Sequence, residues 1–544
     1  MPREIASLTD TRFDLLVVGG GVHGLAAAYD AAQRGLRVAL VERGDFGSGS
    51  SFNHQKTAHG GLRYLQTGDL ARARQSVLER RTLARIAPHL LHPLPFVLPT
   101  YRSLTSGRLA LRAGFLLDRM VGFDRNTGLD TSRHLPAGYT IDRESCLARF
   151  PGVTRRGLTG AGVWHDYQMS DAERLTMAFA TAAREHGAIL ANYTEAQSPV
   201  RRGPRLTGFQ VRDLLDDRDF EITASVTLLA AGAGTGPLLA LCGIPGSVPL
   251  LQAMNVVTSR DAAHEALGGR TKAGRHLFLT PWRRRALIGT WESGATCAPD
   301  ATIGQDQVDA FIAEINQAFP PLDLTRRDVT LVHRGVVPAD VRPDGRVTLK
   351  AHHEIREHGR DGLHGLVSLV GVKYTTARGI AEEAVNVVCG LVDTSADACR
   401  TATTPLPGGE RPDLSALSAE TQRHLGHALP SEVIGHLVDA YGARYRAITD
   451  LIDSRPELAT PLGGGHPVIG AEIIHAGRTE MVCTLTDAVV RRTGLGAAGY
   501  PGDEPARRAA ELLAGELGWD AARVARELAA LRRFYAPLAM AAEA

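Results

Sequence analysis

The feature that most constrains the fold is a glycine-rich segment near the N-terminus, residues 19–24 (GGGVHG). It follows the apolar run 13–18 (FDLLVV), which is typical of a buried parallel strand, and it precedes a stretch of helical composition. A strand, a tight turn and a helix form the context in which GxGxxG binds a dinucleotide. Gly19 permits the turn, Gly21 lets a pyrophosphate approach the backbone, and Gly24 lets the helix pack closely. The segment therefore predicts a Rossmann-like unit.

A second apolar run, RVALV, ends in Glu42, which lies 18 residues after Gly24. An acidic side chain at this place accepts hydrogen bonds from a ribose diol. The next residues, 43–51 (RGDFGSGSS), include Ser50 and Ser51, whose hydroxyls can donate to phosphate oxygens. The other GxGxxG match, GLGAAG at 494–499, directly follows the polar residues RRT and not an apolar run, so the sequence shows one strand–GxGxxG–helix unit, which favours FAD over NAD. A glycine-rich turn without a ligand would leave Glu42 unexplained.

A later segment, residues 226–236 (VTLLAAGAGTG), has the pattern of a strand that runs into a glycine-rich turn. It looks like the second strand-and-glycine element with which flavoproteins of this type close around FAD. An alternative remains open, in which Gly234 and Gly236 serve only a tight turn.

Length and composition limit the remaining possibilities. A chain of 544 residues is too long for one core, so two or three domains are expected. The net charge of +2 argues against a dedicated nucleic-acid-binding protein. The six cysteines form no CxxC pair, which suits reduced thiols and offers no metal site. The polar N-terminus and the lack of an apolar run of about 18 residues predict a cytoplasmic protein without a transmembrane helix.

Residues 56–69 (KTAHGGLRYLQTGD) resemble the FAD-dependent glycerol-3-phosphate dehydrogenase family, whose members carry a K-x-x-H-G-G-L-R-Y-L segment. Further similar segments are DAERL (171–175), TPW (280–282), IGT (288–290), GVKYTTARGIAE (371–382) and EMVCTLTDAVVRRT (480–493). The resemblance extends from Phe13 to about Leu495, and it places the chain among the DAO-type FAD-dependent oxidoreductases. It implies FAD as cofactor, oxidation of a secondary alcohol, and a quinone or other electron acceptor.

The fold that this resemblance implies is α/β, or α+β overall. It has a Rossmann-like FAD-binding domain, an interleaved substrate domain built on an antiparallel sheet, and a C-terminal helical cap. The FAD domain is expected over 1–75, 155–245 and 330–395, and the substrate domain over 76–154 and 246–329. The helical domain is expected over 400–544, after a linker rich in proline and glycine at 403–413.

The resemblance also implies roles for individual residues. His59, whose unperturbed pKa lies near 6.5, is the candidate base, and Arg63 is a permanent cation suited to an anionic substrate. Lys373 is expected to polarise the flavin or orient the substrate. The remaining candidates for substrate binding are Tyr64, Arg334, Lys350 and Thr375. The candidates for cofactor binding are Gly19, Gly20, Gly21, His23, Gly24, Glu42, Arg43, Ser50, Ser51, Gly60, Gly61, Ala231, Gly232, Gly371, Lys373 and Thr375.

The chain departs from the family pattern where the substrate phosphate is held. The family shows an arginine in a G-V-R-P segment, and Val337 stands at that place in HRGVVPADVRP (333–343). Arg334 and Arg342 lie nearby but out of register, and Lys350 stands at a further basic position. The segment LLQAMNVV (250–257) also lacks the K/R-G-S-H pattern of the family.

These departures leave several functions open. In the first, Arg334, Arg342 or Lys350 holds the phosphate, and the enzyme oxidises sn-glycerol 3-phosphate to dihydroxyacetone phosphate. In the second, the substrate is another polyol, a hydroxy acid or a sugar-derived alcohol, and in the third it is an amine. A flavin-binding protein without turnover is a fourth alternative, against which the joint retention of His59, Arg63 and Lys373 argues.

Residues 101–123 mix arginines with leucines and phenylalanines at near-helical spacing. One interpretation is a helix at an anionic membrane surface, with Arg108, Arg112 and Arg119 on the wet side, so that the protein is peripheral on the inner face of the cell membrane. The other is an amphipathic helix that covers the core. Assembly as a homodimer stays open, and no metal is expected.

Overall fold

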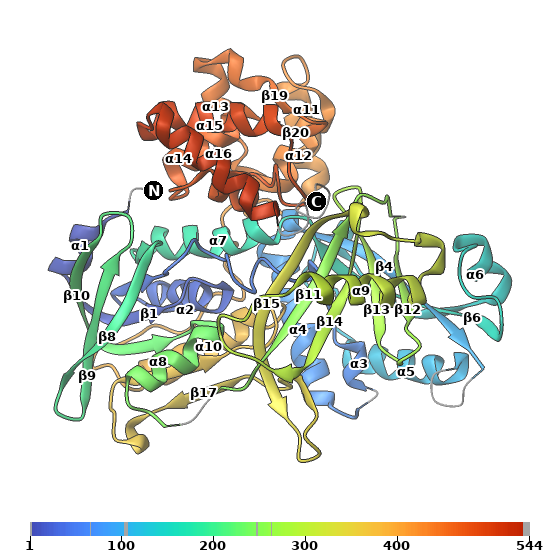
Figure 1. Cartoon of the computed structure of the whole chain (residues 1–544), viewed down its shortest axis with the longest axis horizontal. Helices are drawn as coiled ribbons and strands as arrows, with labels where there is room; N and C mark the ends of the chain where they lie inside the picture. The colour runs from blue at the N-terminus through green and yellow to red at the C-terminus, as the bar shows by residue number, and fades with distance from the viewer. Residues whose placement is uncertain (1–2, 66, 103–106, 246–247, 263, 537–544) are drawn as a thin grey trace.

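The computed structural model describes residues 3–65, 67–102, 107–245, 248–262 and 264–536. Two large sheets lie side by side, and a helical part coloured orange to red covers one end of both (Figure 1). Each of the three parts has its own buried apolar cluster or clusters. This arrangement confirms the predicted fold class, a mixed α/β protein with a C-terminal helical part.

The first sheet has the strand order β17-β18-β10-β1-β2-β7, and β9 and β8 extend it from β10. The strands β18, β10, β1, β2 and β7 pair in parallel, whereas β17, β9 and β8 pair antiparallel. Their bounds are β1 Arg12–Val18, β2 Val38–Val41, β7 Ile189–Ala191, β8 Thr194–Arg202, β9 Arg205–Asp213, β10 Arg218–Leu229, β17 Glu354–Glu357 and β18 Leu366–Val370. The predicted strand before the glycine turn is β1, which lies inside the sheet, as its apolar run requires.

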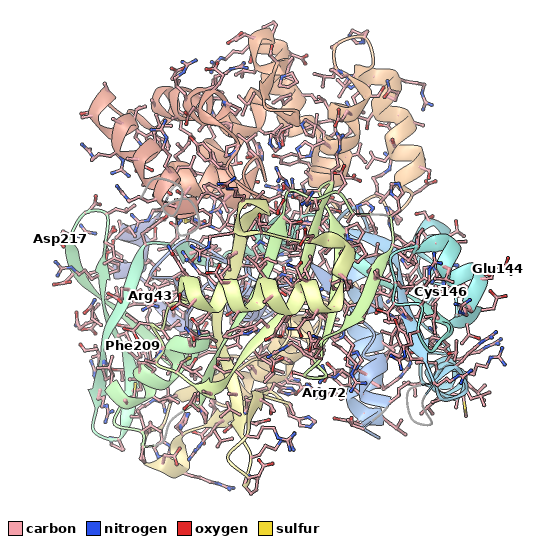
Figure 2. The ribbon with its side chains drawn as sticks, turned by 45° about the vertical axis from the view of Figure 1, so that its right-hand side comes forward. Arg43, Arg72, Glu144, Cys146, Phe209 and Asp217 are labelled. Carbon is pink, nitrogen blue, oxygen red and sulfur yellow. The ribbon has the colours of Figure 1, made fainter. Side chains whose placement is uncertain are left out.

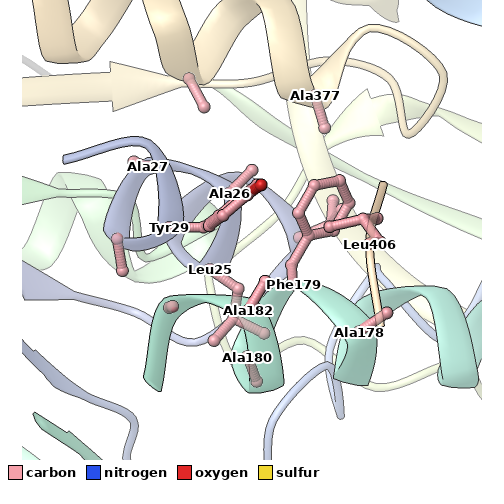
Figure 3. Close-up of a cluster of buried hydrophobic side chains, with 14 of the residues drawn as sticks. Leu25, Ala26, Ala27, Tyr29, Ala178, Phe179, Ala180, Ala182, Ala377 and Leu406 are labelled. Atoms are coloured by element: carbon pink, nitrogen blue, oxygen red, sulfur yellow. The ribbon is translucent and has the colours of Figure 1, made fainter. Parts of the chain in front are cut away.

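Three helices, α2 Val22–Gln33, α7 Ala172–Glu185 and α10 Ala377–Cys389, pack together against this sheet. Figure 3 shows their contact, where Tyr29 of α2, Phe179 of α7 and Leu406 belong to one buried cluster. The ring centroids of Tyr29 and Phe179 are 6.3 Å apart. The other face packs against α1 Ile5–Asp10 and α8 Thr235–Leu241 through Leu8 and Leu239. Helices on both faces bury the sheet, which is the doubly wound arrangement expected of a Rossmann-like unit.

The second sheet has the strand order β16-β15-β11-β14-β13-β12-β4-β6-β3, with β5 beside β6. All its pairings are antiparallel except that of β12 with β4. The helix α9 Gln305–Ala318 covers one face, where Phe311 packs with Met254 and Ile288. The strand bounds are β3 Thr57–Ala58, β4 Leu91–Tyr101, β5 Tyr139–Asp142, β6 Leu158–Met169, β11 Leu250–Thr258, β12 Ala266–Arg270, β13 His276–Trp282, β14 Arg285–Thr296, β15 Val329–Val341 and β16 Val347–Leu349.

The domain boundaries differ from those expected from the sequence. β6 lies in the segment 155–245 assigned to the FAD domain, but it pairs with β4 over most of its length. β15 and β16 lie in the segment 330–395, but they belong to the second sheet beside β11. The elements of the first sheet and its helices therefore begin at α7 in the segment 155–245 and at β17 in the segment 330–395. The reason is that the apolar pattern of a strand does not encode its pairing partner.

The remaining helices frame the second sheet and form the C-terminal part. Those near the second sheet are α3 Leu62–Leu65, α4 Leu70–Ile86, α5 Arg108–Val121 and α6 Arg143–Arg149. The C-terminal elements are α11 Leu414–Leu425, α12 Ser431–Tyr441, α13 Arg446–Ser454, β19 Pro461–Gly463, β20 His466–Ile469, α14 Gly470–Thr479, the π-helix Asp487–Arg492, α15 Asp503–Leu517 and α16 Ala521–Tyr535. In the described ranges, no helix has the length and apolar character to cross a membrane.

Candidate active site

The turn after β1 requires glycine at two positions. Gly19 has a φ of 113°, and a Cβ there would lie 2.7 Å from the carbonyl oxygen of Ala230. A Cβ on Gly24, in the first turn of α2, would overlap the carbonyl oxygen of Gly19. Because glycine alone fits both places, the turn and the close helix packing depend on these residues. Gly21, the N-cap residue of α2, has no side chain to occupy the helix N-terminus, so apart from the Val22 amide, which donates to Ser51, the positive end of α2 can face an anion.

Glu42 follows β2 and lies beside this turn. Its two carboxylate oxygens accept hydrogen bonds from the amides of Gly20, at 2.7 Å, and Gly44, at 2.8 Å. Burial raises the pKa of Glu42, and these two amide bonds oppose the rise. Each oxygen keeps a further lone pair, so the carboxylate can also accept from ribose hydroxyls.

The loop after Glu42 places its serines differently. The Oγ of Ser51 accepts from the amide of Val22 at 2.9 Å, so this side chain lies at the N-terminus of α2. Ser50 is exposed, and its hydroxyl donates to the carbonyl oxygen of Val336 at 3.3 Å, which fastens the loop to β15. Arg43, which is labelled in Figure 2, is exposed. Of these three candidates, Ser51 alone has a contact at the glycine turn.

The ends of β10 and β18 complete the nucleotide site. Gly232 begins the turn after β10, and a Cβ there would meet no atom within 4 Å. Gly371, after β18, packs so closely on His23 that a Cβ would overlap the imidazole. Burial lowers the pKa of His23 to about 4, so this ring is neutral. Ligands of such folds bind at the carboxyl ends of the parallel strands. The helix N-terminus, the carboxylate of Glu42 and the open space at Gly232 together fit FAD.

His59, Tyr64, Lys373 and Thr375 come together from distant parts of the chain. The Nζ of Lys373 lies 3.8 Å from the centroid of the Tyr64 ring, and the ring centroids of His59 and Tyr64 are 6.2 Å apart. The amide of His59 donates to the Oγ1 of Thr375 at 3.3 Å. A Cβ on Gly61 would lie 2.5 Å from the Tyr64 ring. Because Gly61 has no Cβ, the Tyr64 ring can lie against the backbone beside His59.

The electrostatics of this cluster prepare two groups for proton transfer. Burial lowers the pKa of His59 to about 4, since the negative charge of Asp166 offsets desolvation only in part. The ring is therefore neutral near pH 7 and can accept a proton. Burial, together with the positive charge of Arg72, lowers the pKa of Lys373 to about 7. Lys373 can consequently carry or release a proton near neutral pH.

Arg63 lies at the edge of the cluster and is exposed. Burial raises the pKa of Tyr64 and of Glu292, and the positive charge of Arg63 opposes that rise. Burial lowers the pKa of His276, and the charge of Arg63 adds to that fall. In the part of the chain that the structure describes, no carboxylate lies within 4 Å of the Arg63 guanidinium. Arg63 thus remains available to an anionic substrate that approaches from solvent.

The other candidate cations lie away from this cluster. Arg334 pairs with Met254 in the sheet, and Met254 packs beneath α9. Because side chains alternate along a strand, Arg334 points to the face covered by α9, and Val337 points to the opposite face. The Nζ of Lys350 lies 3.6 Å from Asp340 and 3.4 Å from Glu354, so its charge is already matched. The structure therefore does not bring Arg334 or Lys350 to His59.

Arg342, the third of these candidates, also lies elsewhere. It is exposed, and its amide donates to Arg346 in the hairpin between β15 and β16. Val337 packs with Leu251, Ala339 and Val347 in a small apolar cluster. Val337, which stands where the family has an arginine, thus lies among apolar side chains.

Two features of the site were not identified in the sequence. Arg72, on α4, lies with its Cζ 4.2 Å from the centroid of the Tyr64 ring. Asp166, on β6, forms a buried ion pair with Arg80 and accepts from the amide of Gly60 at 2.6 Å. A basic residue in a run of helical composition gives no signal of its own, whereas the pairing of Asp166 with the HGG segment depends on tertiary structure.

Comparison with known proteins identifies two domain families. Residues 14–387 match the model of the FAD dependent oxidoreductase family, and residues 399–524 match the C-terminal domain of alpha-glycerophosphate oxidase. The glycerol-3-phosphate dehydrogenase of Synechocystis sp. is 32% identical over 515 residues, which cover 91% of this chain and 90% of the relative. Glycerol-3-phosphate dehydrogenase 2 of Mycobacterium bovis is 31% identical, with 95% of this chain and 87% of the relative covered.

A solved structure has the same fold. The glycerol-3-phosphate dehydrogenase from Bacillus halodurans, complexed with FAD, superposes with a TM-score of 0.78 at 24% identity. The alignment covers 98% of this chain and 96% of that structure, so the likeness includes the C-terminal helical part. The two family models together span the glycine turn, the cluster around His59 and most of the C-terminal part.

Proposed function

The chain belongs to the FAD-dependent oxidoreductase family, and from this premise we propose that it oxidises sn-glycerol 3-phosphate to dihydroxyacetone phosphate. The observation that carries the proposal is the meeting of a neutral imidazole, His59, with the cations Lys373 and Arg63 near the carboxyl ends of the parallel strands. Relatives that are about 30% identical over most of the chain are glycerol-3-phosphate dehydrogenases, which supports the same substrate.

The residues of the cluster have distinct roles in this reaction. Bound FAD supplies the hydride acceptor. His59 accepts the proton of the secondary hydroxyl, because its imidazole is neutral at working pH. The Thr375 hydroxyl accepts a hydrogen bond from the amide of His59, and the ammonium group of Lys373 packs over the Tyr64 ring. These contacts keep His59 and Lys373 in a fixed geometry. Arg63 attracts the anionic end of the substrate from the solvent side.

The remaining candidate residues would serve the cofactor. Glu42 would bind the ribose of the adenosine half, and the N-terminus of α2 with Ser51 would bind the diphosphate. Gly60, Gly61 and the segment after Gly371 would line the flavin, because small residues permit close approach. These assignments place the flavin between the glycine turn and His59.

Steady-state turnover with a panel of substrates tests this function. Purified holoenzyme is assayed with a soluble quinone and sn-glycerol 3-phosphate, glycerol, short hydroxy acids or amines as donor. We expect glycerol 3-phosphate to give the largest kcat/KM and dihydroxyacetone phosphate to accumulate. Preference for glycerol, a hydroxy acid or an amine would assign a changed substrate, and failure of every donor would indicate a flavoprotein without turnover.

We further propose that the protein binds anionic membrane surfaces through α5, where it passes electrons to a quinone. Leu109, Leu116, Met120 and Phe123 form one stripe along α5 and its C-terminal end, and 64–78% of each residue is exposed. The opposite face, with Leu111 and Phe115, packs on β6 near Gly162. Arg108, Arg112 and Arg119 lie on the same helix, which suits an anionic lipid surface. Residues 103–106 of the predicted segment lie outside the described residues.

Sedimentation with vesicles tests the membrane role. The wild type should bind vesicles that contain phosphatidylglycerol, with partial release in high salt. Leu116→Ser should weaken binding, whereas Leu241→Ser, which removes an exposed leucine of α8, should not. Sedimentation that does not depend on salt, lipid or Leu116 would contradict the role of α5. The quinone acceptor and a homodimer stay predictions, which turnover with quinones and sedimentation velocity would measure.

A further inference from the structure

The ring of Tyr64 lies close to two cationic side chains. Lys373 Nζ lies 3.8 Å and Arg72 Cζ 4.2 Å from its centroid. In the described ranges, no carboxylate oxygen lies within 4.0 Å of either cationic group. Two like charges beside one ring repel each other, and the ring quadrupole offsets only part of that cost.

The nearest carboxylates are already engaged. Asp69 Oδ1 accepts from the amide of Arg72 at 3.1 Å as the N-cap of α4, and its Oδ2 lies 3.5 Å from His352. Asp166 forms an ion pair with Arg80. The two cations around Tyr64 therefore form a partly buried positive site whose charge the protein itself leaves largely unmatched.

The lowered pKa of Lys373 indicates that the site lacks a negative charge between the two cations. Burial and the charge of Arg72 lower the pKa of Lys373 to about 7, so that the charge of this side chain depends on pH near neutrality. A dianion between the two groups would reverse that shift. Guanidinium groups bind phosphate oxygens in bidentate geometry, and an ammonium group acts as a second point charge.

We infer that Arg72 and Lys373 hold the phosphate group of the substrate around the Tyr64 ring and replace the arginine that is absent at Val337. The inference rests on the proposed function. It explains how the chain retains a phosphate site although Val337 lies in an apolar cluster and Lys350 is paired with two carboxylates. Arg72 is thus a specificity-determining residue that distinguishes glycerol 3-phosphate from glycerol.

Substitution of Arg72 tests this site. In Arg72→Gln the KM for glycerol 3-phosphate should rise about 10- to 100-fold, the range expected for loss of a charged hydrogen bond, with kcat changed much less. Turnover of glycerol, which has no phosphate, should change much less than turnover of glycerol 3-phosphate. Arg72→Lys keeps the charge but not the bidentate geometry, and it should recover part of the loss. Arg85→Gln removes the same charge from the same helix, and its KM should not change.

A binding measurement separates this inference from the proposed function. Calorimetric titration of the holoenzyme with inorganic phosphate should show binding in the wild type and in Arg85→Gln, and at least tenfold weaker binding in Arg72→Gln. Equal phosphate affinity and equal KM in wild type and Arg72→Gln would overturn the role of Arg72. If the wild type does not oxidise glycerol 3-phosphate at all, the proposed function fails, whatever the phosphate titration gives.

Discussion

At the scale of single residues, the chemistry depends on how burial sets the charge of His59 and Lys373. Burial keeps the imidazole of His59 neutral and brings the pKa of Lys373 to about 7. In the proposed reaction these two groups close to Tyr64 therefore have different tasks: His59 is the proton acceptor, and Lys373 is a cation whose charge depends on pH. Sequence motifs place both residues, but their protonation follows from the three-dimensional surroundings.

Replacement of His59 tests the proton acceptor. His59→Ala should lower the rate of flavin reduction by about 10²- to 10⁴-fold, because general-base catalysis contributes a factor of this size. The FAD content should not change, since the glycine turn and Glu42 are untouched. His424→Ala, an exposed histidine of α11, is the matched control. A reduction rate within threefold of the wild type would exclude His59 as the base.

The pH dependence of kcat/KM tests Lys373. This parameter reports the free enzyme, in which the pKa of Lys373 is about 7. The amine is cationic below this pKa and neutral above it, so kcat/KM for glycerol 3-phosphate should fall as pH rises through about 7. In Lys373→Arg the alkaline fall should disappear, because a guanidinium stays charged. A fall that persists unchanged in that variant would assign it to another group.

At the scale of elements, the strand–turn–helix unit determines where the cofactor lies. β1 agrees closely with the apolar run 13–18, and α2 follows the turn as expected, because a buried parallel strand and a glycine turn are local patterns. The pairing of β6 and β15 could not be predicted in this way, because it depends on distant strands. For the same reason the sequence suggested Arg334, whose side-chain direction only the strand pairing reveals.

The candidate site was partly predictable from the sequence. His59, Tyr64 and Lys373 lie in segments with a recognisable pattern, and the structure brings them together. Arg72 lies in an ordinary basic helix, so its position beside Tyr64 follows only from the packing of α4. Lys350 is basic and near a family motif, but neighbouring carboxylates neutralise it.

Substitution within the glycine turn tests the cofactor site. Gly24→Ala would overlap the carbonyl oxygen of Gly19 and should lower FAD affinity about tenfold or more, because overpacking costs about 1–3 kcal/mol. Gly49→Ala is the control, since a Cβ there meets no atom within 4 Å. FAD content after dialysis, measured by absorbance, compares the two. Full occupancy in Gly24→Ala would contradict the assignment of this turn to the cofactor.

At the scale of the whole molecule, a buried ionic network joins the C-terminal part to the nucleotide loop. Asp45, three residues after Glu42, accepts from Arg492 at 2.6 and 2.8 Å and from Arg491 at 2.6 Å. Arg491 also donates to Asp487 at 2.6 Å, within the π-helix of the C-terminal part. The loop beside Glu42, the carboxylate proposed to bind the ribose, is thus fastened by residues more than 400 positions away in the chain.

Removal of one charge from this network should release FAD. Asp45→Asn leaves two buried arginines short of a partner, and the loss of one member of a buried ion pair costs about 3–5 kcal/mol. We expect FAD release, followed by flavin fluorescence, at a lower urea concentration than in the wild type. Asp217→Asn removes an exposed carboxylate paired with Arg212 and should have no effect. Equal release midpoints would show that the C-terminal part does not stabilise the cofactor loop.

The central claim is that this cluster oxidises glycerol 3-phosphate, and single-turnover reduction of the flavin tests it most directly. The holoenzyme is mixed anaerobically with sn-glycerol 3-phosphate in a stopped-flow instrument, and the visible absorbance of the flavin is followed. The account predicts rapid and complete bleaching by glycerol 3-phosphate and slow bleaching by glycerol at the same concentration. An oxidised flavin that persists with glycerol 3-phosphate, while another alcohol or an amine bleaches it, would contradict the account.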